Sequence, residues 1–218
     1  MKVVMDQTFK FFTDTASITA FDPQRIENRV DDEADWWCGD LLELDEIQTG
    51  AATIVLLGGD GYFQARVTDG DLTDVDRDYA ADVVKDLGVE VVSGKLIIGP
   101  GECLPGEGCR ANDERGMTIQ LENGQYSVDV YFINWRESAR WYTEDEVAPG
   151  DAPAEFVIQI RPRTESFTEL EDEPMLDDLP DDFLFESSTR QVGPEPGLTL
   201  VSKVRKGADG TLLLKDCC

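Results

Sequence analysis

Histidine is absent from this chain of 218 residues. Without an imidazole the chain lacks the commonest general base and metal ligand of proteins, which excludes Ser–His and Cys–His catalysis. Long hydrophobic runs are also missing, since the longest, residues 51–57, is far too short to cross a bilayer. The first residues contain neither the apolar stretch nor the cleavage site of a secretory signal. We therefore expect a soluble, cytoplasmic protein.

Cysteine is scarce, and its spacing is not that of a disulfide framework. The five cysteines are an odd number, unlike the paired set of a small secreted domain. Cys103 and Cys109 flank a loop rich in glycine and proline, and Cys217 and Cys218 end the sequence. This spacing is also not that of a usual zinc knuckle. We expect free thiols, no metal and no cofactor, and the sequence leaves open whether these four cysteines ever pair or bind a metal.

Acidic residues outnumber basic ones by more than two to one. The chain has 46 Asp and Glu against 19 Lys and Arg, which gives a formal net charge of −27. Such a charge repels nucleic acid and anionic membranes and attracts basic proteins. We expect a basic protein as partner, no binding to nucleic acid or to membranes, and no enzymatic activity, because no catalytic pattern is present.

Short strands with tight turns dominate the apolar pattern. Residues 8–21 predict two short strands around a turn, and residues 52–68, 89–99 and 117–133 each predict a β-hairpin. The clearest hairpin joins strands 117–121 and 125–133 through Asn123–Gly124, which suits a type I′ turn. Residues 155–161 predict one further strand.

Helical patterns are few and short. Asp22 and Pro23 suit the N-cap and the first position of a short helix, and residues 79–86 predict another. The hydrophobic content of 41% is enough for a packed core. The sequence therefore predicts an α+β fold that is predominantly antiparallel β, a sandwich or a meander with a few short helices.

Composition divides the chain into three parts. Residues 1–163 form the expected β-rich core domain. Residues 164–190 are acidic, contain two prolines, and predict a linker or a segment that wraps the surface. Residues 191–218 predict a C-terminal hairpin that packs on the core, because they hold the one basic concentration of the chain, Lys203, Arg205, Lys206 and Lys215.

Two motifs resemble ligand sites but lack essential residues. Asp74, Asp76 and Asp78 begin like a calcium-binding loop, yet Tyr79 replaces the turn glycine and Lys85 replaces the closing glutamate. The glycine-rich residues 99–108 lack the spacing and the lysine of a phosphate-binding loop. We expect neither site.

Two acidic segments contain apolar residues and are the candidate partner-binding surfaces. Residues 31–46 hold eight acids and no basic residue around a tryptophan pair, and residues 165–186 also lack basic residues. Aromatic anchors rimmed by carboxylates are common at interfaces, although an indole more often fills the core. The expected contact residues are Asp31, Asp32, Glu33, Asp35, Trp36, Trp37, Asp40, Glu43, Glu171, Asp172, Glu173, Asp177, Asp178, Asp181, Asp182 and Phe183.

Two resemblances add to these inferences. Residues 12–23 (FTDTASITAFDP), 31–37 (DDEADWW) and 59–67 (GDGYFQARV) resemble an uncharacterised bacterial domain family. The whole profile, which is small, acidic, β-rich and free of catalytic signatures, is similar to the immunity proteins that bacteria pair with secreted toxins, those of type VI secretion among them. The second resemblance implies one-to-one inhibition of a basic antibacterial toxin, a nuclease foremost.

Two alternatives stay open. Lysine, with seven residues, is scarcer than arginine, with twelve, which suits a surface adapted to high salt with an unrelated function. A catalytic or metal-binding site made of carboxylates alone would also leave no readable pattern among so many acids.

Overall fold

The computed structural model describes residues 5–33, 36–37, 42–138, 140–141, 151–167, 170, 172–176, 205–206 and 212–213. The chain divides into two compact units, Met1–Phe185 and Glu186–Cys218. In the second unit, β10 (Arg205–Lys206) pairs with β11 (Leu212–Leu213) in antiparallel fashion. The expected packing of this hairpin on the core stays a prediction.

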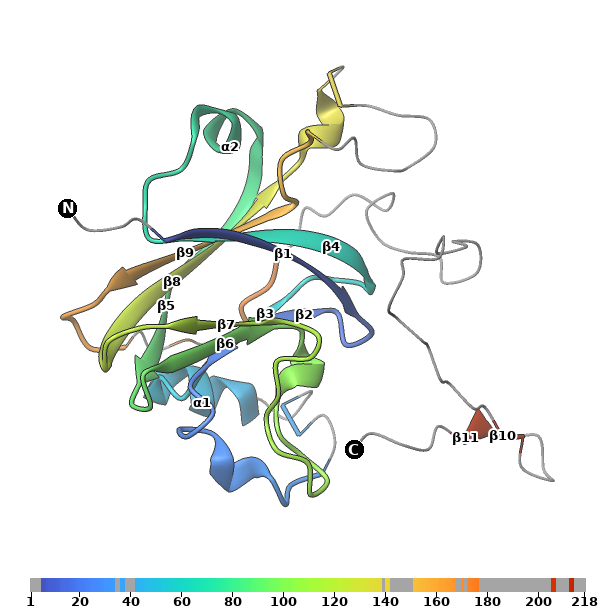
Figure 1. Ribbon diagram of the computed structural model, residues 1–218, viewed down its shortest axis with the longest axis vertical. Coiled ribbons are helices and arrows are strands. Elements are labelled where there is room, and N and C mark those ends of the chain that lie inside the picture. The colour runs from blue at the N-terminus through green and yellow to red at the C-terminus, as the bar shows by residue number, and fades with distance from the viewer. Residues whose placement is uncertain are drawn as a thin grey trace. The chain divides into compact units, whose positions relative to one another are not determined.

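Two β-sheets face each other in the first unit (Figure 1). The five-stranded sheet has the order β1 (Asp6–Thr13), β4 (Gly61–Thr68), β9 (Phe156–Pro162), β8 (Gly124–Ile133) and β5 (Ala80–Val91). The four-stranded sheet has the order β3 (Ala52–Leu56), β2 (Ser17–Phe21), β6 (Lys95–Gly99) and β7 (Met117–Gln120). Neighbouring strands are antiparallel except for the parallel pair β4 and β9. The predicted fold class is therefore confirmed.

Helices occupy little of the described chain. They are α1 (Leu42–Thr49), α2 (Asp74–Tyr79) and three single 3₁₀ turns, Glu27–Arg29, Gly101–Cys103 and Trp135–Glu137. The helix predicted over residues 79–86 is wrong, because α2 ends at Tyr79 and the following residues belong to β5. No helix in the described ranges is long and apolar enough to span a membrane.

The predicted hairpins are wrong in one respect, since their strands form but do not pair with each other. β3 and β4, β5 and β6, and β7 and β8 each lie in opposite sheets, as do β1 and β2. The Asn123–Gly124 step thus carries the chain from one layer to the other, and Asn123 Nδ2 donates to the Val92 carbonyl at 2.7 Å. Alternation shows which face of a strand is apolar, but both layers of a sandwich have an apolar inner face, so it does not show which layer a strand joins.

Asp22 has a different task from the predicted N-cap. Its buried carboxylate accepts hydrogen bonds from the backbone N–H groups of Gln24 (2.8 Å), Val92 (2.7 Å) and Ser93 (2.6 Å). The chain after it makes turns and then the 3₁₀ turn Glu27–Arg29 rather than an α-helix. Asp22 therefore ties the end of β2 to the turn between β5 and β6.

Aromatic side chains fill the space between the sheets at the β1 side. Phe11, Phe63, Phe132 and Phe156 are buried, and the rings of Phe63 and Phe156 meet edge to face with centroids 5.1 Å apart. Such edge contacts add to the burial of aromatic area. This core holds the strands in place.

Candidate protein-binding surface

Two loops far apart in sequence join to form one acidic surface. The N–H of Glu107 donates to the carbonyl of Asp32, and the N–H of Gly108 donates to that of Val30, both at 2.7 Å. We call residues 27–33 and 102–115 the acidic loop pair. These two ranges hold eight acids against three arginines. Because backbone hydrogen bonds join the loops, their carboxylates are held in a defined arrangement.

The tryptophan pair lies beneath this surface rather than on it. Trp36 is 6% exposed and Trp37 is 2% exposed. The indole N–H of Trp36 donates to the carbonyl of Pro105 at 2.8 Å, and the Trp37 ring packs against Gly101 so closely that no Cβ fits there. The exposed anchor that the sequence suggested is therefore not provided by either indole, and both rings act as supports of the loops.

The Arg29 side chain binds residues of its own chain. Its guanidinium stacks on Trp36, 4.6 Å from the ring centroid, and binds Asp32 (2.9 Å) and Glu46 (2.6 Å). Burial alone would lower the pKa of Arg29, but the hydrogen bonds and charges of the two carboxylates raise it above its usual value. Asp32 and Glu46 thus share one arginine as their partner, whereas Asp31 and Glu33 are exposed.

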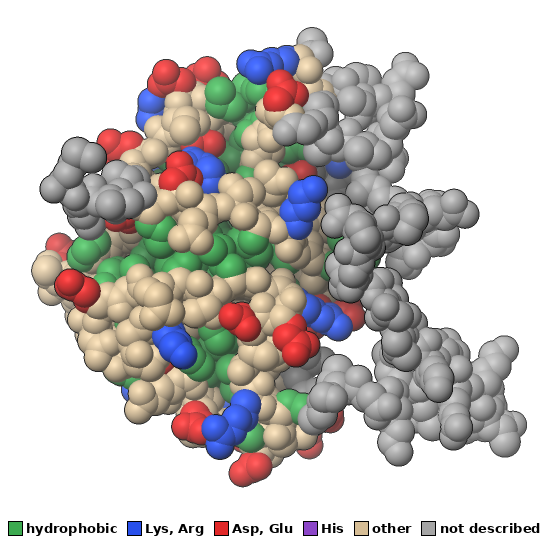
Figure 2. All heavy atoms as spheres, in the orientation of Figure 1, with side chains coloured by type: hydrophobic (Ala, Val, Ile, Leu, Met, Phe, Trp, Pro, Cys, Tyr) green, Lys and Arg blue, Asp and Glu red, His purple; other side chains and the backbone are tan. Residues whose placement is uncertain are grey.

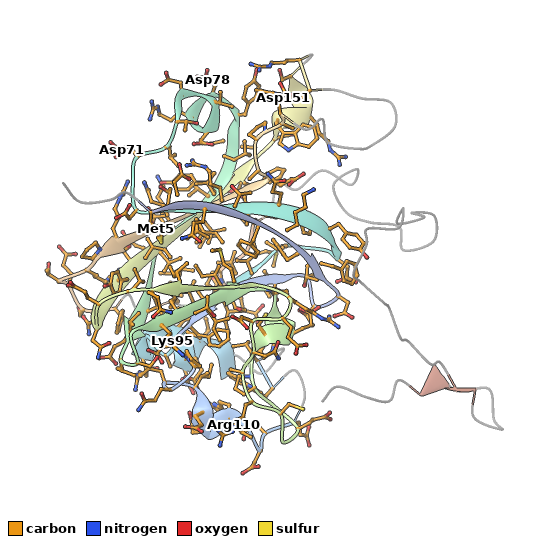
Figure 3. The ribbon with its side chains drawn as sticks, viewed as in Figure 1. Met5, Asp71, Asp78, Lys95, Arg110 and Asp151 are labelled. Carbon is orange, nitrogen blue, oxygen red and sulfur yellow. The ribbon has the colours of Figure 1, made fainter. Side chains whose placement is uncertain are left out.

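A shallow hollow of about 260 Å³ lies beside the loop pair. Its walls include Pro23, Val30 and Ala111, and Glu27 and Arg110 stand at its rim, 3.3 Å apart. Arg110 is labelled in Figure 3, where the loops reach the bottom of the view. The apolar walls suit the stem of a long side chain, and the carboxylate of Glu27 is already paired with Arg110.

Glu102 lies at the other end of the loop pair. Its carboxylate accepts hydrogen bonds from the N–H of Asp14 (2.6 Å) and the hydroxyl of Thr15 (2.9 Å), and Arg115 lies 3.5 Å away. Burial raises the pKa of Glu102 to about 7, and the nearby Asp14 carboxyl adds to the rise. This side chain thus holds the turn between β1 and β2 against the loop.

The second candidate segment is partly docked on the edge strand β3. Leu176 is 1% exposed, and its N–H donates to the Leu56 carbonyl at 2.9 Å. Leu56 N–H donates in turn to the Pro174 carbonyl at 2.8 Å. Asp172 is exposed and Glu173 is half-buried beside this contact. The remaining predicted contacts lie outside the described residues or side chains, and they are Asp35, Asp40, Glu43, Glu171, Asp177, Asp178, Asp181, Asp182 and Phe183.

The loop of residues 102–115 was missed as part of a binding surface. Its four acids, Glu102, Glu107, Asp113 and Glu114, stand in the sequence, but their meeting with Asp32 depends on long-range pairing. The glycines and the proline of this loop indicated only an irregular connection. Local pattern contains no signal for such a contact.

The acidic D-x-D-x-D stretch is structural. Asp76 is buried, caps α2 through Thr73, and binds the Arg66 guanidinium, which also reaches Asp6 at 3.1 Å. Within the described residues, no group of three or more Cys, Asp or Glu side chains is placed to hold a metal ion. A second hollow, of about 310 Å³, opens between Arg66 and the Arg140–Asp151 pair.

Cys103 and Cys109 are the described cysteines, and Cys103 has a free thiol. Cys103 is fully buried, and burial raises the pKa of its thiol to about 12, which suppresses the reactive thiolate. Cys217 and Cys218 lie outside the described residues.

Comparison with known proteins gives a family and two distant likenesses of shape. No curated protein matches the chain. A structure described as crocagin biosynthetic gene J has 13% sequence identity and a TM-score of 0.49, over 75% of this chain and 100% of its own. The structure of ComJ from Bacillus subtilis, described as an inhibitor of the DNA-degrading activity of NucA, has 10% identity and a TM-score of 0.41, over 74% of this chain and 100% of its own. Likenesses this distant assign no activity. Residues 5–137 match the family of unknown function DUF6386, and the chain belongs to that family.

Proposed function

We propose that this chain is a cytoplasmic inhibitor, not an enzyme, that binds a basic antibacterial toxin one to one, a nuclease foremost. The observation that carries the proposal is the acidic loop pair, a fixed surface with eight acids against three arginines. A nuclease presents Lys and Arg to phosphates, so a carboxylate surface opposes its active site directly. Opposite charges of this size also steer association toward about 10⁸–10⁹ M⁻¹s⁻¹.

Preorganisation supports the loop pair as the contact surface. Trp36, Trp37 and Arg29 hold the loops from beneath, so little conformational entropy is lost when a partner binds. Asp31, Glu33 and Glu107 are exposed and free to meet cations. The neighbouring hollow offers apolar walls to a side chain of the partner, while Glu27 stays paired with Arg110.

The acidic segment of residues 165–186 is the alternative candidate for the contact surface. Its docked portion presents the side chain of Met175, which is 43% exposed, next to Asp172 and Glu173. An exposed apolar side chain beside carboxylates adds buried area, which charge alone does not supply.

The experiment is co-purification and toxicity rescue with the protein encoded by the adjacent gene. One variant reverses three charges on the loop pair, Asp31→Lys, Glu33→Lys and Glu107→Lys. The matched control reverses three exposed acids elsewhere, Asp60→Lys, Asp78→Lys and Glu122→Lys. Both variants have the same net charge, so they separate the position of charge from its amount.

We expect the loop-pair variant to associate at least about tenfold more slowly at 50 mM salt and to lose most of its salt dependence. The control variant should lose much less. Absence of binding and rescue by the wild type would refute the proposed function, and equal losses in both variants would refute the loop pair as the contact surface.

A further inference from the structure

Four strands form the edges of the two sheets, and three of them are guarded against pairing. Sheet edges attract further strands unless they are short, bulged, covered or charged. β5 has two register shifts in its pairing with β8, β7 has only four residues, and β3 is covered at Leu56 by residues 174–176. The fourth edge is β1.

β1 is neither short, bulged nor covered in the described structure, and its protection consists of the charged residues Asp6 and Lys10. It has eight residues without proline, and it pairs with β4 in unbroken register. The Met5 carbonyl accepts the Asp69 N–H at 3.2 Å, which assigns the odd-numbered residues to the hydrogen-bonded pairs with β4. The N–H and C=O groups of Asp6, Thr8, Lys10 and Phe12 therefore point away from the sheet.

An apolar band accompanies this free edge. Figure 2 shows hydrophobic side chains in a band between the upper and lower layers, and Figure 1 shows β1 and β7 on this near side. Met5 and Phe9 on the β1 side and Met117 and Leu121 at the ends of β7 are half-buried. A strand added to β1 would cover these side chains and satisfy the outward backbone groups together.

We propose that two copies of this chain pair through β1 in antiparallel fashion about a two-fold axis at Thr8. In this register Asp6 of each copy, which also contacts Arg66 of its own chain at 3.1 Å, lies opposite Lys10 of the other, so that two symmetric ion pairs form. The outward groups of Asp6, Thr8 and Lys10 then face those of the second copy. The two five-stranded sheets become one continuous sheet.

Charge selects this register over its neighbours. A shift by two residues removes both ion pairs, and a shift by four places Asp6 opposite Asp6 or Lys10 opposite Lys10. Like charges directly opposite each other destabilise a strand pair. A strand that places a basic residue opposite Lys10 is repelled. A second copy in the Thr8 register, which places Asp6 there, is therefore favoured.

The pairing is weak and depends on salt in a distinctive way. One added strand buries less than a standard interface, so we expect a weak dimer with a dissociation constant on the order of 10–100 μM. Each copy has a net charge of −27, so screening of their repulsion strengthens the dimer as ionic strength rises. Binding to a basic toxin weakens with salt, whereas the dimer strengthens. The dimer and the toxin inhibition can therefore be tested independently.

The test is sedimentation velocity of the full chain at about 100 μM and at 0.05, 0.15 and 0.5 M salt, near the proposed dissociation constant. Thr8→Pro removes the central outward N–H but no bond to β4, and Thr8→Val is its control because it keeps that N–H. Lys10→Glu places a carboxylate opposite Asp6, and Lys95→Glu makes the same charge change on β6. Melting curves show that each variant is folded.

We expect a dimer fraction that grows with salt for the wild type, Thr8→Val and Lys95→Glu, and monomers for folded Thr8→Pro and Lys10→Glu. A wild type that stays monomeric at about 1 mM and 0.5 M salt overturns the proposal, because even a weak dimer forms there. Dimerisation of Thr8→Pro at wild-type strength overturns pairing through β1. Dimerisation of Lys10→Glu at wild-type strength overturns the register at Thr8.

Discussion

The indole N–H of Trp36 donates to the Pro105 carbonyl at 2.8 Å and thereby joins two loops that are 69 residues apart in the sequence. Trp36 also lies under the Arg29 guanidinium. A residue that looked like an exposed interface anchor is thus the internal support of a surface made of carboxylates. Its substitution should act on the fold first and on binding only through the fold.

Replacing Trp36 separates these two effects. Trp36→Phe keeps most of the ring but leaves the Pro105 carbonyl without its donor, and we expect a loss of about 1 kcal/mol in the free energy of unfolding. Trp36→Ala also removes a buried ring and should cost about 3–5 kcal/mol. Urea denaturation measures both. Equal stability of Trp36→Ala and wild type would contradict the structural role.

Arg29 offers a second test of the loop pair. Arg29→Met keeps the apolar stem but leaves Glu46, whose side chain is 10% exposed, without its cation. We expect a loss of about 2–4 kcal/mol, because an unpaired charge stays buried. The double variant Arg29→Met with Glu46→Gln should recover part of this loss, as measured by urea denaturation. Failure to recover any would show that packing, not charge, is what Arg29 supplies.

The sequence predicted the strands better than their partners. The alternation at residues 117–121 and 125–133 marks two real strands, and Asn123–Gly124 marks a real reversal of the chain between them. Whether that reversal closes a hairpin or crosses to the other sheet depends on long-range pairing, here of β7 with β6 and of β8 with β5 and β9. Local turn chemistry does not contain that information.

The sequence predicted that the candidate surface is acidic, but not which residues form it. The acids at positions 31–33 are exposed or half-buried, as expected, and the tryptophans beside them are buried. Sequence alone gave Trp36 either role, because an indole is amphipathic and suits both a core and an interface. Glu107 joins this surface only through its backbone bond to Asp32, which no spacing rule predicts.

Phe167 packs on the bare backbone of β5, which gives a test of how the segment after β9 docks. A Cβ at Gly88 would overlap the Phe167 ring, which also lies against Gly50. We expect Gly88→Ala to cost about 1–3 kcal/mol by displacing the ring. In a Phe167→Ala background the same substitution should be nearly neutral, and thermal or urea unfolding of the four proteins measures this coupling. If the losses of stability of the two single variants add up in the double variant, the Phe167 ring does not lie against Gly88.

Glu102 gives the fold a specific dependence on pH. Its pKa in the folded protein is raised from 4.5 to about 7, so the folded state holds this proton more tightly than the unfolded chain. The contribution to stability is therefore full below pH 4.5 and falls as the pH rises toward 7. Glu102→Gln cannot titrate, so its free energy of unfolding should fall less steeply than that of wild type between about pH 5 and 7.5.

The control for this prediction is Glu114→Gln, which removes an exposed carboxylate from the same loop. The other carboxylates of the chain also titrate in acid, so the informative quantity is the difference in slope between variants rather than the slope of the wild type. Glu114→Gln removes one carboxylate from the same loop without changing the contacts of Glu102, so it controls for the loss of a charge. Urea denaturation at several pH values measures the three slopes. If Glu102→Gln and Glu114→Gln have the same slope, burial does not raise the pKa of Glu102 in the folded protein.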